Sequence, residues 1–292
     1  MEIKYSELVS IKNVNVQRIN GNEISFFSDT LSVEEPLEIR ISYGSGADRI
    51  QKNISVTMRT PGNDTELAVG FLFTEGIISS YEDVEHAYPV EMNCLSKKQN
   101  IIQVDLTENF SPNLMQTDRN FYTTSSCGVC GKSSIQSIKT VSSFSNLVRS
   151  EIKIDASLFY LLPEKLRIAQ SDFASTGGLH ASGLFNIEGD LILLTEDVGR
   201  HNALDKLIGQ SLMNQSLPLN EHILLLSGRA SFELIQKAAM AGISIIASIG
   251  APSSLAVELA QEFNITLLGF LKENKLNVYS KSDQTVITTG LK

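Results

Sequence analysis

The chain has 292 residues, of which 42% are apolar and 20% are charged, and its formal net charge is −9. This composition provides enough apolar surface for a sizeable core and excludes a disordered chain. The acidic balance argues against binding nucleic acid through a broad positive surface, but it permits a small anion in a local basic pocket.

The start of the sequence and its cysteine content indicate the compartment. The first residues show no basic stretch followed by an apolar run, and no apolar run approaches the ~20 residues of a membrane span. The three cysteines, an odd number, suit a reducing environment. We therefore expect a cytoplasmic protein that has neither nucleic acid nor a membrane as a partner.

The N-terminal part predicts mainly strands. Residues 1–60 are strand-like, with apolar residues alternating over 37–43 and again over 54–58. A Gly-Ser-Gly turn lies between these two runs. Residues 81–109 predict a short helical piece and then a strand over 101–106.

One helix is expected within this β-rich part. Asp64 is the predicted helix cap and Gly76 the predicted stop. Gly70 lies inside the helix, where it costs roughly 1 kcal/mol relative to Ala, and close packing against another backbone would explain its presence. Arg59, just before the helix, is either a surface charge or an anion contact, and taken alone the surface charge is favoured.

A polar, glycine-containing stretch holds Cys127 and Cys130 in a C-x-x-C arrangement, followed by a segment that can begin a helix. The free N–H groups and the dipole of a helix start favour a thiolate, and Lys132 adds positive charge, so a low-pKa, nucleophilic cysteine is predicted. The alternatives are half of a zinc site, which needs two more Cys or His ligands, or neither chemistry. Cys94 is the remaining cysteine, and buried filler is its favoured role.

The next segment predicts a helix followed by a hairpin. Pro163 is expected at the first position of the helix. Strands follow over 179–187 and 191–194, joined by a tight turn. His180 on the first strand is more often a hydrogen-bonded structural residue than a ligand. The two glycines before it favour a site, because they let a ligand approach the backbone.

A polar cluster at residues 195–206 follows directly on the buried strand and runs into a helix. It contains Arg200 and His201. Charged groups at the end of a buried strand lie where α/β proteins place their ligand sites. The plainer alternative is a helix cap with ion pairs on a solvated turn, but the density of polar residues favours a functional site.

The last hundred residues alternate strand and helix, which indicates a parallel sheet between helices. Two strand-to-helix turns, 227–231 and 250–254, place Gly and Ser at a helix start, where backbone N–H groups can bind phosphate. Arg229 adds a planar donor of several hydrogen bonds. Neither turn is a P-loop, and each alone is a weak signal, but together they favour a phosphate-bearing ligand.

Six motifs in one order carry a family resemblance. They are residues 59–62, 66–76, 126–131, 176–182, 196–206 and 227–231. With these motifs the chain resembles, over residues 30–285, the FdhD family of formate dehydrogenase accessory proteins, which carry sulfur to the molybdenum cofactor.

The resemblance implies a defined activity. Proteins of this family accept a sulfane sulfur from a cysteine desulfurase as a cysteine persulfide. They pass it to bis-molybdopterin guanine dinucleotide, the molybdenum cofactor, before insertion into the catalytic subunit of formate dehydrogenase. By resemblance Cys127 is the persulfide carrier, Cys130 assists or resolves, and the protein forms a homodimer.

The resemblance and the two helix starts together give an expected binding site for the dinucleotide, which GDP or another guanine nucleotide would also occupy. No metal ligands are assigned. The expected contacts are Phe270, Leu271, Lys272, Glu273, Asn274, Lys275, Arg59, His180, Arg200, His201, Ser227, Gly228 and Arg229.

The expected fold class is α/β, or α+β overall. The resemblance implies a C-terminal, cytidine-deaminase-like three-layer α/β sheet, preceded by a β-rich N-terminal subdomain. The expected division is 1–115 for the β-rich subdomain, 116–150 for the cysteine loop with its linking helix, and 151–292 for the α/β subdomain.

Three rival functions are weighed against sulfur transfer. A zinc deaminase needs H-x-E followed by P-C-x-x-C, whereas here the order is reversed and Ser182 stands where the Glu should be. A disulfide oxidoreductase of the thioredoxin type would carry C-x-x-C directly after an early strand of a small domain. A non-catalytic chaperone for the molybdenum cofactor remains the alternative, with the cysteines serving only for docking or as occasional metal ligands.

Overall fold

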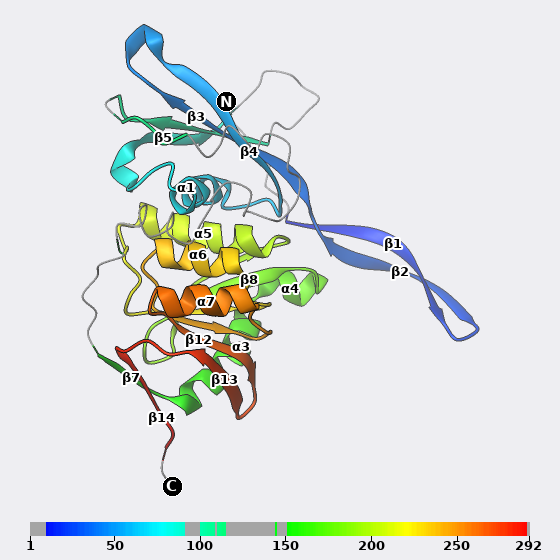
Figure 1. The fold of residues 1–292 in the computed structure, drawn as a ribbon. Coiled ribbons are helices and arrows are strands. Elements are labelled where there is room, and N and C mark those ends of the chain that lie inside the picture. Colours follow the sequence, from blue (N-terminus) through cyan, green and yellow to red (C-terminus); the bar gives the residue numbers. More distant parts are fainter. Residues whose placement is uncertain (1–9, 91–99, 109, 115–143, 145–150, 291–292) are drawn as a thin grey trace.

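The computed structural model describes residues 10–90, 100–108, 110–114, 144 and 151–290, which form a stack of layers (Figure 1). A four-stranded sheet lies at one end, followed by helix α1, by the helices α5, α6 and α7, by a six-stranded sheet, and by α3 on its far face. This arrangement confirms the predicted α/β fold with a β-rich N-terminal part. The domain boundaries near residues 115 and 150 stay predictions.

The N-terminal part is built from hairpins. The strands β1 (Ile11–Asn20) and β2 (Glu23–Ser32) form a ribbon that extends away from the body (Figure 1). The four-stranded sheet has the order β4-β3-β6-β5. Its strands are β3 (Glu35–Tyr43), β4 (Ile50–Arg59), β5 (Val84–Pro89) and β6 (Ile101–Leu106), with 3-10 turns at Gly46–Asp48 and Tyr81–Asp83. The sequence missed β5, because this edge strand buries a single residue, Val84.

Helix α1 (Asp64–Thr74) ends as predicted, since Gly76 follows it with a φ of 70°. Its start differs from the prediction. Asn63 is the N-cap residue, in the left-handed region with a φ of 54°. The carboxylate of Asp64 accepts hydrogen bonds from Arg59 at 2.8 Å instead of capping the helix, so the predicted Asp64 cap is wrong.

The six-stranded sheet has the order β13-β12-β11-β10-β8-β9. The three strands β10, β11 and β12 are parallel, as the alternation of strand and helix predicts, and antiparallel strands complete both sides. The elements are β8 (His180–Phe185), β9 (Leu191–Asp197), α5 (Arg200–Met213), β10 (Ile223–Leu226), α6 (Phe232–Met240), β11 (Ile245–Ser248), α7 (Ser254–Glu262), β12 (Thr266–Lys272) and β13 (Lys275–Ser280).

Helix α3 (Ala156–Ala169) begins seven residues before the predicted start at Pro163, which lies inside the helix. Asp155 caps it by accepting a hydrogen bond from the backbone N–H of Ser157 at 2.9 Å. Burial of Phe159, among others, on the face against the sheet outweighs the backbone hydrogen bond that a proline removes. Around this helix lie β7 (Ile152–Asp155), paired with β14 (Thr285–Thr288), and α4 (Ser171–Thr176).

Two apolar cores lie on opposite faces of the six-stranded sheet. The larger one joins that sheet, α5, α6, α7 and α1 to the four-stranded sheet. The smaller one lies beneath α3 and includes Phe159 and Phe185. Within the described ranges, none of the helices combines the length and the apolar content that crossing a bilayer requires.

The contact between α1 and α5 joins the N-terminal and C-terminal parts. A Cβ atom at Gly70 would lie 1.9 Å from the backbone oxygen of Asp205, and one at Gly209 would lie 1.9 Å from the backbone oxygen of Glu66. The two helices therefore pack backbone against backbone, which confirms the reason predicted for Gly70. This close contact positions the end of β4 beside the start of α5.

Candidate functional site

The candidate site is one edge of the six-stranded sheet. The strands β9, β10, β11 and β12 all run toward this edge, and the antiparallel β8 begins there, with His180 paired opposite Asp197. The predicted residues at the start of β8, at the start of α5 and in the two glycine-serine turns are thus brought to a single edge. This is the position at which open α/β sheets bind ligands.

Main-chain hydrogen bonds hold the turns of this edge in a row. The backbone of Ser227 bonds to Ala181, whose N–H also donates to the Ser227 hydroxyl at 2.8 Å. The N–H of Gly250 then donates to the carbonyl of Gly228 at 3.0 Å, and the N–H of Phe270 donates to the carbonyl of Gly250 at 3.1 Å. The ends of four neighbouring strands are therefore fixed relative to one another.

Gly228 allows His180 to lie close to the backbone of this row. A Cβ atom at position 228 would lie 3.3 Å from Nδ1 of His180, tighter than an ordinary contact. The pKa of His180 is lowered, first by burial and then by the charge of Arg200, although Asp197 works against this. The lowered pKa makes the neutral imidazole the favoured form of His180 at pH 7.

Two helix starts at this edge lack a side-chain cap. Helix α5 begins after Gly199 and α6 after Ser231, and neither residue accepts a capping hydrogen bond through its side chain. Helix α7 differs, because the Ser253 hydroxyl accepts a bond from the N–H of Ala256 at 3.2 Å. The starts of α5 and α6 thus offer N–H groups to an anion, while the 250–254 turn shows ordinary capping.

Arg200 and Arg229 supply positive charge to the edge. Arg229 is exposed beside Gly250, and Arg200 is the first residue of α5. The Nε atom of Arg200 is buried and has no hydrogen-bond partner among the described residues. An anionic ligand at the start of α5 would meet an arginine whose donors are not all used.

His201 lies deeper, between α5 and α6. Its Nε2 is 3.4 Å from the Ser231 hydroxyl and 3.8 Å from a carboxylate oxygen of Glu233. Burial, then Lys237 and Arg200, lower the pKa of His201 to about 4, so it is neutral at pH 7. Sequence reasoning missed Glu233, because nothing in the spacing of residues 201 and 233 indicates that they meet.

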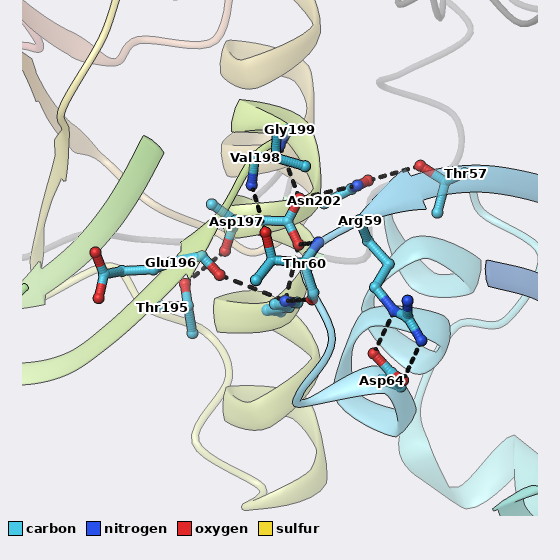
Figure 2. Close-up of polar contacts among 12 residues, drawn as sticks. Thr57, Arg59, Thr60, Asp64, Thr195, Glu196, Asp197, Val198, Gly199 and Asn202 are labelled. Carbon is cyan, nitrogen blue, oxygen red and sulfur yellow. Dashed lines mark hydrogen bonds and ion pairs between the residues drawn. The ribbon is translucent and has the colours of Figure 1, made fainter. Parts of the chain in front are cut away.

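Arg59 is held against Asp64 at the start of α1 instead of facing this edge, and Figure 2 shows the two side chains in contact. Its side chain has an exposed fraction of 0% and donates two hydrogen bonds of 2.8 Å to Asp64, with Glu35 at 3.6 Å. Both expectations for Arg59, a surface charge or an anion contact, are therefore wrong. The arginine joins the end of β4 to the first turn of α1 and has no face left for a ligand.

Much of the polar cluster at 195–206 is structural (Figure 2). The fully buried Asp197 accepts hydrogen bonds from the N–H groups of Thr60 and Gly199, at 3.1 and 2.7 Å, and from the Asn202 amide at 3.2 Å. The ammonium of Lys206 lies 2.8 Å from Asp197 and also donates to the carbonyl of Thr60. This network ties the end of β4 to β9 and α5, so only Arg200 and His201 of the cluster are left to face the edge row.

The stretch 270–275 meets the edge at one end only. Phe270 is 40% exposed beside Gly250, but the Leu271 side chain is buried in the smaller core, so its expected contact with a ligand stays a prediction that only its backbone can meet. The remaining residues form the exposed hairpin between β12 and β13, which Lys272 and Lys275 close as a pair. Cys127 and Cys130, like Cys94, lie outside the described residues.

The fold and the edge row define an α/β protein whose candidate ligand site is an edge rich in helix starts and arginines. The model of the FdhD/NarQ family matches residues 32–286, and the chain belongs to this family.

Relatives span nearly the whole chain. The protein named sulfur carrier protein FdhD from Mycolicibacterium paratuberculosis is 49% identical, over 88% of this chain and 92% of its own length. Proteins of the same name from Streptomyces coelicolor and Saccharolobus solfataricus are 43% and 40% identical, each over 94% of this chain and over 96% and 98% of their own lengths.

A solved structure shares the fold. It is a crystal structure from Desulfotalea psychrophila, described as a formate dehydrogenase accessory protein, with a TM-score of 0.68 and 21% identity. The match covers 95% of this chain and 100% of the other. The expected family and its fold are confirmed.

Proposed function

We propose that this protein is a sulfur carrier, a sulfurtransferase that works in the cytoplasm as a homodimer during the maturation of formate dehydrogenase. One observation carries the proposal: relatives named sulfur carrier protein FdhD share 40–49% of their residues with almost the full length of this chain. The ligand edge described above supports it, because carrying sulfur to a cofactor requires a binding surface for that cofactor.

In this proposal the Cys127 thiolate attacks the outer sulfur of a cysteine persulfide on a cysteine desulfurase. A new S–S bond forms at Cys127, the S–S bond of the donor breaks, and the donor cysteine leaves as a thiolate. Cys130 is the assisting or resolving thiol. Its thiolate attacks the Cys127 sulfur, so that the carried sulfur leaves as hydrosulfide with the bonding electron pair. A disulfide remains between the two cysteines, and a thiol reductant restores them.

The proposed substrate is the molybdenum cofactor with its two guanine dinucleotides, bound along the edge row. Its phosphates would meet the helix starts of α5 and α6 with Arg200 and Arg229, which matches the chemistry of phosphate binding. The exposed ring of Phe270 offers an apolar face for a base or a pterin at the end of the row. A guanine nucleotide such as GDP would occupy the same surface.

Mass spectrometry tests the sulfur-carrier proposal. The protein is incubated with a cysteine desulfurase and cysteine, alongside the variants Cys127→Ala and Cys130→Ala, with Cys94→Ala as the matched control. We expect the wild type and the control to gain the mass of one sulfur atom on the peptide containing Cys127, removable by reductant. The absence of added sulfur on wild-type Cys127 would contradict sulfur carriage.

The alternative is a non-catalytic chaperone that binds the cofactor and the apoenzyme, and the same edge row favours it equally. The two functions separate in the Cys127→Ala variant. If this variant binds GDP and still matures formate dehydrogenase, the chaperone function is correct. If it binds GDP normally and formate dehydrogenase stays inactive, sulfur transfer is supported.

A further inference from the structure

The β1–β2 ribbon, residues 10–33, is an arm that protrudes from the body (Figure 1). Its two strands pair along their full length, from Ile11 opposite Ser32 to Asn20 opposite Glu23. Its root lies against α4, where the Ser32 hydroxyl bonds to the Thr176 hydroxyl at 2.8 Å. None of the arm's residues is buried. A two-stranded ribbon without a further layer is only marginally stable in water, so this arm requires a covering surface.

The arm carries apolar side chains where they meet water. Ile19, Ile24 and Phe26 are 69%, 59% and 78% exposed near the tip. The register pairs Ile19 with Ile24, and Phe26 with Gln17, which places the three apolar side chains on one face of the ribbon. Exposed apolar groups gathered on one face mark an interaction surface.

Charge favours the acidic chain itself as the partner. The arm contains Lys12 and Arg18 against Glu23 and Asp29, so its net charge is zero, while the whole chain carries −9. Two copies of an acidic protein repel each other, and a neutral arm is the element that can lie against a second copy with the least repulsion.

The size of the arm favours reciprocal exchange. Ten residues per strand give a ribbon roughly 33 Å long and roughly 10 Å wide, so one face of one arm on one partner buries about 660 Å² in total, counting both surfaces. That is below the ~1,000 Å² expected of a specific interface, whereas two arms exchanged about a two-fold axis bury about 1,320 Å².

We infer that the arm clasps a second copy of this chain and that the clasp is reciprocal. The inference rests on the homodimer of the proposed function and names its interface. The outer face of the edge strand β4 is a receiving surface of suitable chemistry, because Val56 and Met58 there are 64% and 48% exposed. The arm tip of each copy would cover such apolar side chains on the other.

Sedimentation of the full chain tests the clasp. The tip variant replaces Ile19, Ile24 and Phe26 by Thr, which keeps β propensity and removes apolar area. The matched control is Leu161→Gln, a change at a 55% exposed apolar residue on α3. We expect a dimer for the wild type and the control, and a dimer dissociation constant raised at least about 100-fold in the tip variant.

Hydrogen–deuterium exchange of the peptide covering residues 11–32 provides a second readout. It should be slow in the wild-type dimer and fast in the tip variant, because the uncovered ribbon frays. A wild type that is monomeric at tens of micromolar, or a tip variant that dimerises like the wild type, overturns the inference. A tip variant that stays dimeric but no longer matures formate dehydrogenase also overturns it, since the arm then serves a different partner.

Sulfur loading separates this inference from the proposed function. A monomeric tip variant that still gains sulfur on Cys127 agrees with both the clasp and the sulfur-carrier proposal. Failure of wild-type Cys127 to gain sulfur removes the sulfur-carrier proposal and leaves the clasp untouched.

Discussion

The ion pair between Lys206 and Asp197 should be among the most sensitive points of the fold. Their side chains have exposed fractions of 2% and 0%, and the ammonium lies 2.8 Å from the carboxylate. The Lys206→Met variant would leave Asp197 charged and buried, with N–H donors from Thr60 and Gly199 but no cation. Removing one partner of a buried pair costs about 3–5 kcal/mol.

Urea and thermal unfolding measure this cost. A loss of this size corresponds to a fall of roughly 6–15 °C in the melting temperature of a chain of this length. The double variant Asp197→Asn with Lys206→Met should be more stable than Lys206→Met alone, because it removes both charges and keeps an acceptor for the Thr60 N–H. We expect a coupling free energy of at least about 1 kcal/mol between the two sites.

The control is Lys153→Met, which breaks the ion pair between Lys153 and Glu151, whose side chains are 71% and 58% exposed. Loss of this exposed pair should leave the unfolding midpoint unchanged. A loss below about 1 kcal/mol for Lys206→Met would show that the pair does not clamp the two parts of the chain. A double variant no more stable than Lys206→Met would refute the charge argument, leaving lost packing as the cause.

Three further predictions concern backbone packing, pH and ligand binding. The Gly70→Ala variant would place a Cβ atom 1.9 Å from a backbone oxygen of α5, so it should lose more than about 4 kcal/mol of unfolding free energy or fail to fold. In the control Gly178→Ala the nearest atom to the new Cβ lies at 3.4 Å, so its melting followed by circular dichroism should match that of the wild type. Because the pKa of His201 is lowered to about 4, the unfolded chain binds a proton that the folded chain does not, so stability should fall by about 3 kcal/mol as pH falls from about 6.5 to 4. His201→Gln should remove that part of the pH dependence in urea unfolding, and an NMR titration midpoint of His201 above pH 6 would contradict the reasoning. Arg229→Gln should weaken GDP binding about 10-fold, measured by calorimetry, whereas the control Arg40→Gln, on the distant N-terminal sheet, should bind GDP like the wild type. Equal GDP affinity in the two variants would show that Arg229 does not contact the ligand.

Sequence periodicity predicted the elements whose burial is one-sided or complete. The strands β3, β10, β11 and β12 and the end of α1 at Gly76 follow directly from alternation, apolar runs and a positive-φ glycine. It could not find β5, because one buried residue leaves no pattern. It also misplaced the start of α3, because a local rule for Pro163 was outweighed by tertiary burial of the helix face.

The site was predictable as a set of turns, not as individual contacts. Strand ends and helix starts predicted Arg200, Ser227 and Arg229, and the two glycines before it predicted His180; the structure brings all four to one edge. It could not show that Arg59 is enclosed by Asp64 and Glu35, because this depends on how β3, β4 and α1 pack in three dimensions. The proximity of Glu233 to His201 depends likewise on the packing of α5 against α6.

An acidic chain can present a positive edge because two of the carboxylates close to that edge are paired with buried lysines. Asp197 is paired with Lys206, and Asp205 with Lys237 at 2.9 Å, both below the surface. Burial acts to lower the pKa of Lys237, but Asp205 and Glu75 raise it by more, so this lysine stays charged and its pair adds little net field.

Both imidazoles at the edge are neutral, so the charge seen by a ligand comes from the arginines and the helix starts. Arg200 and Arg229 therefore set the sign of the edge. Glu233 lies 3.8 Å from His201, and among the described residues no lysine or arginine pairs with it within 4 Å. Neutralising it should strengthen anion binding, in the direction opposite to Arg229→Gln. A Glu233→Gln variant that binds GDP more weakly would show instead that the carboxylate contacts the ligand directly.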